Sequence, residues 1–143
     1  MKNFALRSVI AVAALAAAAV CASAQTYKAE IPIAFTAGSA KMAPGTYEFR
    51  VTNASGGTPT VSVQNSVTKR VAMVIPYTGA DVPAARVEQG TPYLSFKCLD
   101  GNCALSKLYS GVSAQAYGFS GLRAKAAEKE RLAVLEIGLT KAD

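Results

Sequence analysis

The sequence predicts an all-β protein, an antiparallel sandwich or flattened barrel of about seven short strands with one short helix near the C-terminus. Two observations predict this class. Beyond residue 24, apolar side chains recur at every second position, which is the period of a strand with one buried face. Segments rich in glycine, proline, asparagine and serine separate these runs, as turns separate short strands.

The N-terminal segment has the pattern of an export signal. Lys2 and Arg7 form a basic start, residues 9–20 are an unbroken apolar run, and residues 22–24, Ala-Ser-Ala, have the form of a cleavage site. The run is too short to span a bilayer core of about 30 Å as a helix. We therefore expect a signal peptide over residues 1–24, no transmembrane segment after its removal, and an exported chain in the periplasm or outside the cell.

Cys21 offers a lipoprotein alternative, in which this cysteine carries a lipid anchor. Bulky Val20 precedes it, whereas signal processing favours small residues before the cut. Cleavage after Ala24 removes Cys21 and leaves two cysteines in the exported chain. Residues 25–143 then form a single β domain, which is long enough to bury a core without a metal ion.

Four runs of alternating apolar residues predict the first four strands. Pro32 has no amide hydrogen to give to a sheet, so the first strand is expected at an edge or a bulge. Residues 78–91 lack the alternation, and we expect a long loop there, with at most a short irregular strand at residues 86–88. The alternating residues are Ile31, Ile33 and Phe35; Tyr47, Phe49 and Val51; Val61 and Val63; and Val71, Met73 and Ile75.

A hairpin clasped by a disulfide is predicted at residues 98–103, Cys-Leu-Asp-Gly-Asn-Cys. The alternative, a reactive dithiol, is less favoured because redox sites usually show Cys-x-x-Cys. Two thiols without a histidine do not complete a zinc site, so no metal is expected. The predicted register pairs Cys98 with Cys103, Phe96 with Leu105, and Leu94 with Lys107.

The C-terminal segment is ambiguous between helix and strand. Residues 122–131 consist of helix formers, whereas residues 133–139 alternate as a strand does. We expect a short helix followed by a closing strand. One continuous helix over residues 122–137 is the alternative.

Four short motifs run through the exported chain in a recognisable order. Residues 31–38 read Ile-Pro-Ile-Ala-Phe-Thr-Ala-Gly and residues 42–47 read Met-Ala-Pro-Gly-Thr-Tyr. A hairpin of residues 92–96 and 105–109 follows, and then a charged Lys/Ala/Glu/Arg segment at residues 125–131. This order resembles a family of small exported bacterial β-domain proteins of uncharacterised function, in which an extended strand and a glycine precede Leu-Pro-Ala-Gly-x-Tyr. Proline and alanine are exchanged here, and the resemblance implies a fold but no activity.

The sequence offers few groups for catalysis, and we expect neither an enzyme nor a cofactor. It contains no histidine, which excludes Ser-His and Cys-His nucleophiles. Residues 66–69, Ser-Val-Thr-Lys, match Ser-x-x-Lys without the partner motifs of penicillin-recognising enzymes. A small hydrolase using two carboxylates about 5–10 Å apart is the remaining catalytic alternative. The acids Glu30, Glu48, Asp81, Glu88 and Asp100 fall on polar faces or turns.

A binding or envelope-associated structural role is therefore the predicted function. The net charge is +6, but the basic residues are dispersed, so nucleic acid is not expected as a partner. An envelope glycan or protein is the candidate partner. Tyr109, Tyr117 and Phe119 are candidate ligand-facing rings, although we favour packing within the fold for them. A strand-accepting assembly or adhesion subunit is the alternative, with its open edge at residues 31–35.

Overall fold

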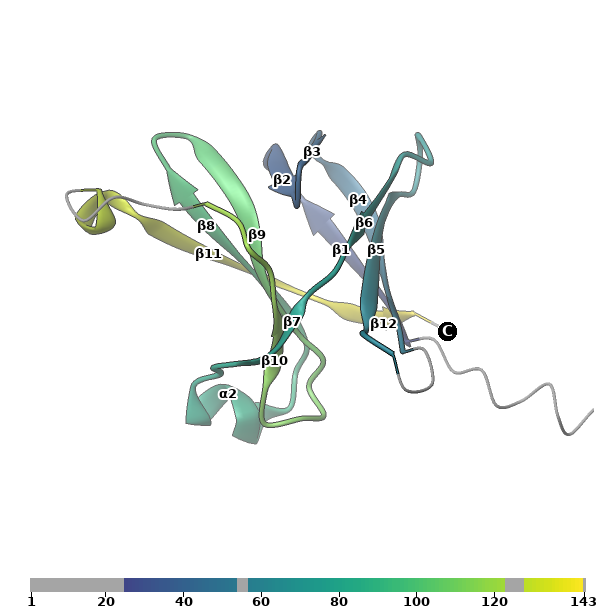
Figure 1. Ribbon diagram of the computed structural model, residues 1–143, viewed down its shortest axis with the longest axis vertical. Coiled ribbons are helices and arrows are strands. Elements are labelled where there is room, and N and C mark those ends of the chain that lie inside the picture. Colours follow the sequence, from purple (N-terminus) through teal and green to yellow (C-terminus); the bar gives the residue numbers. More distant parts are fainter. Residues whose placement is uncertain (1–24, 54–56, 123–127, 143) are drawn as a thin grey trace, which may run out of the picture.

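Two β-sheets build the protein, as the computed structural model shows (Figure 1). The structure describes residues 25–53, 57–122 and 128–142. The predicted signal peptide, residues 1–24 with Cys21, lies outside the described residues. The all-β, mainly antiparallel class is confirmed, and over the described ranges the two sheets keep separate edge strands and do not close into a barrel.

The smaller sheet has five strands in the order β12-β1-β4-β5-β6. Its inner face carries the alternating residues of the predicted second and third strands, and Phe49 and Val63 are completely buried. Its outer face is mostly polar. The strands are β1 (Gln25–Ile31), β4 (Gly45–Thr52), β5 (Thr60–Asn65), β6 (Val71–Val74) and β12 (Thr140–Ala142).

The larger sheet has seven strands. Its main path runs β11-β8-β9-β10-β7, and a small hairpin of β2 and β3 joins it through β9. The strands are β2 (Phe35–Ala37), β3 (Ala40–Met42), β7 (Tyr77–Ala80), β8 (Tyr93–Leu99), β9 (Asn102–Tyr109), β10 (Ala116–Gly118) and β11 (Ala133–Gly138). A short helix, α2 (Ala84–Gln89), and a 3₁₀ turn, η2 (Lys129–Arg131), complete the described elements.

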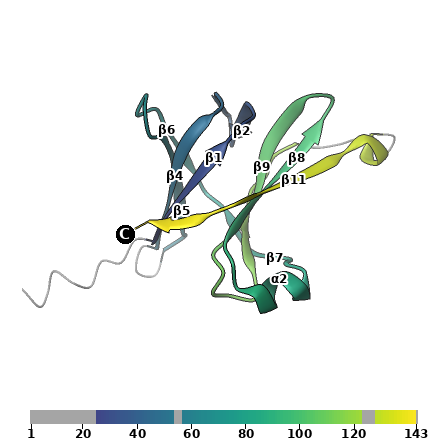
Figure 2. The same ribbon diagram turned by 180° about the vertical axis from the view of Figure 1, so that it is seen from behind.

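The chain passes repeatedly between the two sheets. It leaves the smaller sheet after β1 and again at residues 75–76, after β6. The C-terminal segment returns, because β11 pairs with β8 in one sheet and β12 pairs with β1 in the other (yellow in Figures 1 and 2). The buried residue Leu139 joins them. The main core lies between the sheets, where Phe49 and Val61 meet Phe96, Leu94 and Leu108.

The first predicted strand is wrong in its extent and its place. β1 ends at Ile31, and the chain breaks at residues 32–34 before β2 begins. Pro32 falls in this break, where its missing amide hydrogen costs no sheet bond. Since β1 lies between β12 and β4, it is not an edge, and the open edge expected at residues 31–35 is not there.

Residues 78–91 also differ from the prediction of a loop with an irregular strand at residues 86–88. They contain the end of β7 and all of α2. Pro83 precedes the helix, helix-favouring residues fill it, and Gly90 ends it in the left-handed conformation with φ of 64°. Because residues 84–89 show no apolar alternation that would favour a strand, their helical propensity determines the local structure.

The C-terminal prediction is confirmed in its strand. β11 covers Ala133–Gly138, so the alternative of one continuous helix to residue 137 is wrong. Most of the predicted helix at residues 122–131 lies outside the described residues, and its described end is the 3₁₀ turn η2. The described residues form twelve strands against about seven expected, because several predicted runs are divided and some strands have three residues.

The disulfide between Cys98 and Cys103 is confirmed, with Cα atoms 4.0 Å apart. Asp100 and Gly101 both have positive φ, 50° and 84°, as a two-residue type I′ turn requires. The register holds from the cystine to Phe96, which faces Leu105.

Beyond that pair the predicted register is wrong, because a bulge at Ser106 shifts it and Leu94 faces Leu108 instead of Lys107. Without the bulge, Lys107 would lie on the inner face and Leu108 on the outer one. Burial of Leu105 and Leu108 on the same face explains the shift.

Candidate functional site

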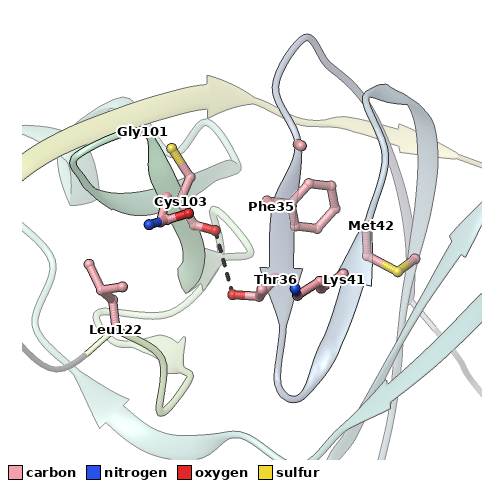
Figure 3. Close-up of a pocket in the computed structure, with 9 residues that line it drawn as sticks. Phe35, Thr36, Lys41, Met42, Gly101, Cys103 and Leu122 are labelled. Carbon is pink, nitrogen blue, oxygen red and sulfur yellow. Dashed lines mark hydrogen bonds between the residues drawn. The ribbon is translucent and has the colours of Figure 1, made fainter.

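A groove lies where the β2–β3 hairpin meets the clasped tip of the β8–β9 hairpin (Figure 3). The two hairpins are joined by one parallel pair, Thr36 with Ala104. The Thr36 hydroxyl also donates a hydrogen bond of 3.5 Å to the carbonyl oxygen of Cys103. This narrow junction leaves a hollow of about 360 Å³ beside it.

The floor of the groove is apolar and firmly held. Phe35 and Met42 face each other across the β2–β3 hairpin, and both are buried. The Phe35 ring makes edge contacts with Tyr47 and Phe96, at centroid distances of 5.1 and 5.3 Å. These contacts tie the floor to both sheets. The lining residues are Ala34, Phe35, Thr36, Lys41, Met42, Gly101, Asn102, Cys103 and Leu122.

The rim of the groove is polar and carries one positive charge. Among the described lining residues, Lys41 has the only charged side chain, and the described part of the chain offers it no ion pair. The exposed Asn102 amide lies on the opposite side, on the clasped tip. An apolar floor below an ammonium and an amide suits a ligand that has an apolar body and an acceptor or anionic end.

Cys103, one half of the cystine, lines one wall of this groove. Cys98 and Cys103 are half-buried and pack against the main core. On the far side of the tip, the carboxylate of Asp100 lies 3.4 Å from the guanidinium of Arg131 in η2, an exposed pair of small energetic weight. The tip is thus held by the covalent bond and by its inner packing, and the groove wall it forms is preorganised.

A second hollow, of about 380 Å³, lies where the β11–β12 segment passes β1. Its charged lining residues are Lys28 and Glu30, of opposite sign. Lys28 is 3.7 Å from Glu48 and is therefore already partnered. This hollow lacks an aromatic residue in its lining and gives a ligand no uncompensated charge, so we place the candidate site at the groove beside the cystine.

The three rings predicted as ligand-facing do not gather on the surface. Tyr109 is completely buried and packs against Tyr93, with ring centroids 5.5 Å apart. Phe119 is buried in the main core. Tyr117 is half-buried and lines a smaller pocket of about 160 Å³ with Gly79. Packing within the fold, the interpretation that we favoured, describes Tyr109 and Phe119.

Helix α2 is held against the larger sheet by one arginine. The Arg86 guanidinium lies 4.7 Å from the centroid of the Tyr93 ring and donates to the carboxylate of Glu136 on β11. Burial raises the pKa of Tyr93 above its ordinary value of 10.0, and nearby Glu136 raises it further while Arg86 lowers it. This cluster joins the helix to two strands and has a structural role.

The residues considered for catalysis lie apart from the groove. Ser66 is in the turn after β5, not at a helix start, and its hydroxyl has no hydrogen-bond partner among the residues that the structure describes. Glu48 pairs with Lys28 on the outer face of the smaller sheet, and Asp100 pairs with Arg131. Over the described ranges, no three cysteine, aspartate or glutamate side chains cluster as metal ligands would.

Sequence reasoning missed the residues that form the groove. In the sequence, three strands of the smaller sheet (β4, β5 and β6) and two of the larger sheet (β7 and β8) separate Lys41 from Asn102. Only the parallel contact of β2 with β9 brings their hairpins together. No local period predicts such a pairing. The one available signal was the cystine, which marks a tip that is held rigid.

The comparisons with known proteins add no further assignment. In the described ranges, none of the helices has the length and apolar character needed to cross a membrane. No protein-family model, curated protein or solved structure matches the chain.

Proposed function

We propose that this chain is an exported, non-catalytic binding module and that the groove beside the cystine is its binding site. The ligand class is a small amphiphile with an apolar body and an anionic end, such as a carboxylate. The observation that carries the proposal is the combination of a buried aromatic and thioether floor, Phe35 and Met42, with the ammonium of Lys41 at the rim, which has no ion pair among the described residues.

The contacts favour such a ligand over the other candidate partners. An apolar body lies against the apolar part of the groove lining, where each methylene that leaves water contributes about 0.8 kcal/mol. The ammonium of Lys41 and the amide of Asn102 supply hydrogen-bond donors for the acidic end. A glycan is less suited, because the described lining offers no exposed aromatic face on which a sugar ring stacks.

The proposed location is the periplasm or the outside of the cell. The supporting observations are the export pattern of residues 1–24 and the disulfide of Cys98 and Cys103, since disulfides persist in oxidising compartments. A rigid groove wall is useful there, because it needs no ordering when the ligand arrives.

The test is a calorimetric titration of residues 25–143 with dodecanoate, below its critical micelle concentration, and with dodecanol as the uncharged partner probe. Lys41→Gln should weaken dodecanoate binding about tenfold and leave dodecanol binding unchanged. Ala34→Trp, which fills the groove from an exposed position, should abolish both. The matched control is Lys141→Gln, which removes an exposed lysine on β12.

Two outcomes would contradict the proposal. One is the absence of heat with both probes at the solubility limit. The other is binding that Lys41→Gln and Ala34→Trp leave unchanged, since the probe would then occupy a different place.

A further inference from the structure

Strand β6 ends the smaller sheet and leaves one side of its backbone open (Figure 2). The amide of Asn65 donates to the carbonyl of Arg70 at 2.9 Å, which makes these two residues a hydrogen-bonded pair. Because such pairs alternate in an antiparallel ladder, Ala72 bonds to β5, whereas the amide groups of Val71 and Met73 point away from it. Over the described residues, β6 pairs only with β5.

The outer face of β6 is an apolar stripe. Val71, Met73 and Ile75 are 49%, 67% and 72% exposed. Ala72 and Val74, on the other face, are buried in the core. Ile75 directly follows the strand. We call Val71, Met73 and Ile75 the β6 stripe.

The stripe contrasts with the strands beside it. On the same face, β5 places polar Ser62 opposite Met73 and Gln64 opposite Val71. The next strand, β4, places Arg50 opposite Ser62. The outer face of the smaller sheet is therefore polar up to its last strand and apolar there.

The edge strands β3, β7, β11 and β12 each carry a charge or an irregularity, Lys41 in the case of β3, whereas β6 carries neither. β11 carries Glu136, held by Arg86, and β12 carries Lys141. β7 has an irregular register with β10 and contains Gly79 at a φ of 85°. Charges and irregularities of this kind prevent edge-to-edge association. β6 has no charged residue between Val71 and Ile75.

We propose that the β6 edge pairs with the β6 edge of a second copy of this chain, in an antiparallel two-fold arrangement centred on Met73. In this register Val71 faces the partner's Ile75, and Met73 faces the partner's Met73. A two-fold interface requires such self-complementarity, and the stripe has an apolar side chain at each of its three positions. The same strand pairing lets the outward amide groups of Val71 and Met73 donate hydrogen bonds to backbone carbonyl groups of the partner.

The charges flanking the stripe fit this arrangement. Lys69 and Arg70 precede it, and Pro76 and Tyr77 follow it. Lys69 and Arg70 lie before β6, in the β5–β6 turn, and Tyr77 already belongs to β7 of the other sheet. Antiparallel pairing therefore places the cations of the two copies at opposite ends of the interface. A parallel pairing would place like charges side by side.

The result is a continuous ten-stranded sheet across two copies, since each contributes five strands. The contact is narrower than a standard interface, so we expect a dissociation constant on the order of 10 μM. Self-association goes beyond the proposed ligand binding, because the groove lies on the other sheet and does not include β6.

The test is sedimentation equilibrium of residues 25–143 over a concentration series, with three variants. Met73→Lys and Met73→Glu should each raise the dissociation constant at least tenfold, because each variant places two like charges opposite each other at the centre of the interface. An equimolar mixture of the two variants should restore association, because Met73 faces its own copy in the proposed register. The matched control, Val134→Lys, changes a valine that is 61% exposed on the β11 edge and should leave association unchanged.

Circular dichroism shows whether Met73→Lys and Met73→Glu remain folded, which we expect because this side chain is two-thirds exposed. A wild-type chain that stays monomeric at concentrations well above 10 μM would overturn the proposal. So would unchanged association of Met73→Lys, or a mixture of the two charged variants that stays as weak as each alone.

Discussion

Two hairpins of the protein, β8–β9 and β5–β6, differ in how firmly the fold holds them. The β8–β9 hairpin lies inside its sheet, both faces of β8 are buried around Leu94 and Ser95, and a cystine closes its tip. The β5–β6 hairpin ends its sheet, has one exposed face, and is closed by a turn of ordinary hydrogen bonds at Asn65. The first hairpin gives a fixed wall to a groove, and the second leaves backbone and apolar surface available to a partner.

This difference shows that one fold can hold one hairpin rigid and leave another hairpin accessible to a partner. Buried aromatic contacts and a covalent bond hold the groove wall in one shape, so a ligand meets a site that needs little ordering. An edge strand cannot be held in the same way, because its outer hydrogen-bonding groups have no partner within the chain. The predictions below test the contrast by changing one hairpin at a time.

The largest effect is expected from Phe96→Ala in the inner hairpin. Phe96 is completely buried and contacts the ring of Phe35, so truncation leaves a cavity under the groove floor. The free energy of unfolding should fall by about 3–5 kcal/mol. The matched change in the edge hairpin, Met73→Ala, should cost less than about 0.5 kcal/mol in the monomer. Urea denaturation measures both, and equal losses would contradict the contrast.

The double variant Cys98→Ala/Cys103→Ala removes the disulfide at the tip of the β8–β9 hairpin. The chain-entropy account gives a loss of about 2 kcal/mol for a loop this short. The strand register should survive, because the inner residues from Phe96 to Leu105 still pack. Denaturation at equal pH gives the loss, and hydrogen exchange of the β9 amides reports on the register. A protein that no longer folds would show that the cystine holds the whole sheet rather than its tip.

Asn65→Ala opens the turn of the edge hairpin. The Asn65 side-chain oxygen accepts hydrogen bonds from the amides of Val67 and Thr68, at 2.9 and 3.0 Å. Their loss should cost about 1–2 kcal/mol, since Asn65 is buried. Asn65→Asp, which keeps an acceptor, is the control. We expect self-association to weaken with Asn65→Ala and ligand binding to stay unchanged.

The smallest effect concerns pH and the packing of α2 on the inner hairpin. The folded state raises the pKa of Tyr93 above 10.0, so it holds the phenolic proton more tightly than the unfolded chain does. The stability this provides is present below pH 10 and is lost as the pH rises through the folded-state pKa. Tyr93→Phe should reduce the decline in stability above pH 10, measured by urea denaturation. An equally steep decline would assign it to other groups, Tyr27 among them, whose pKa burial also raises.

The sequence predicted those parts of the fold in which one period dominates. In β4 and β5, apolar and polar residues alternate strictly, so the buried face was clear, and the cysteine spacing fixed the tip of the inner hairpin. Residues 71–75, Val-Ala-Met-Val-Ile, are apolar on both faces, and the period alone does not tell which face is buried. The structure buries Ala72 and Val74 and exposes Val71, Met73 and Ile75.

The candidate site was beyond sequence reasoning for a different reason. The groove depends on the parallel contact between Thr36 and Ala104, which are far apart in the chain and are joined through a single pair of the short strand β2. The rings at Tyr109 and Phe119 were visible in the sequence, but their burial follows from how β9 and the residues after β10 pack. Local patterns predict strands and turns, whereas a site formed by two hairpins depends on their tertiary pairing.

The central claim is that the groove beside the cystine is the ligand site and that the β6 edge is not. The most direct measurement is a series of amide NMR spectra of ¹⁵N-labelled residues 25–143 during titration with dodecanoate. We expect shifts at the amides of Thr36, Lys41, Asn102 and Cys103 and unchanged positions for the amides of β6. Shifts confined to Val71 and Met73, or no shifts at any amide, would contradict it.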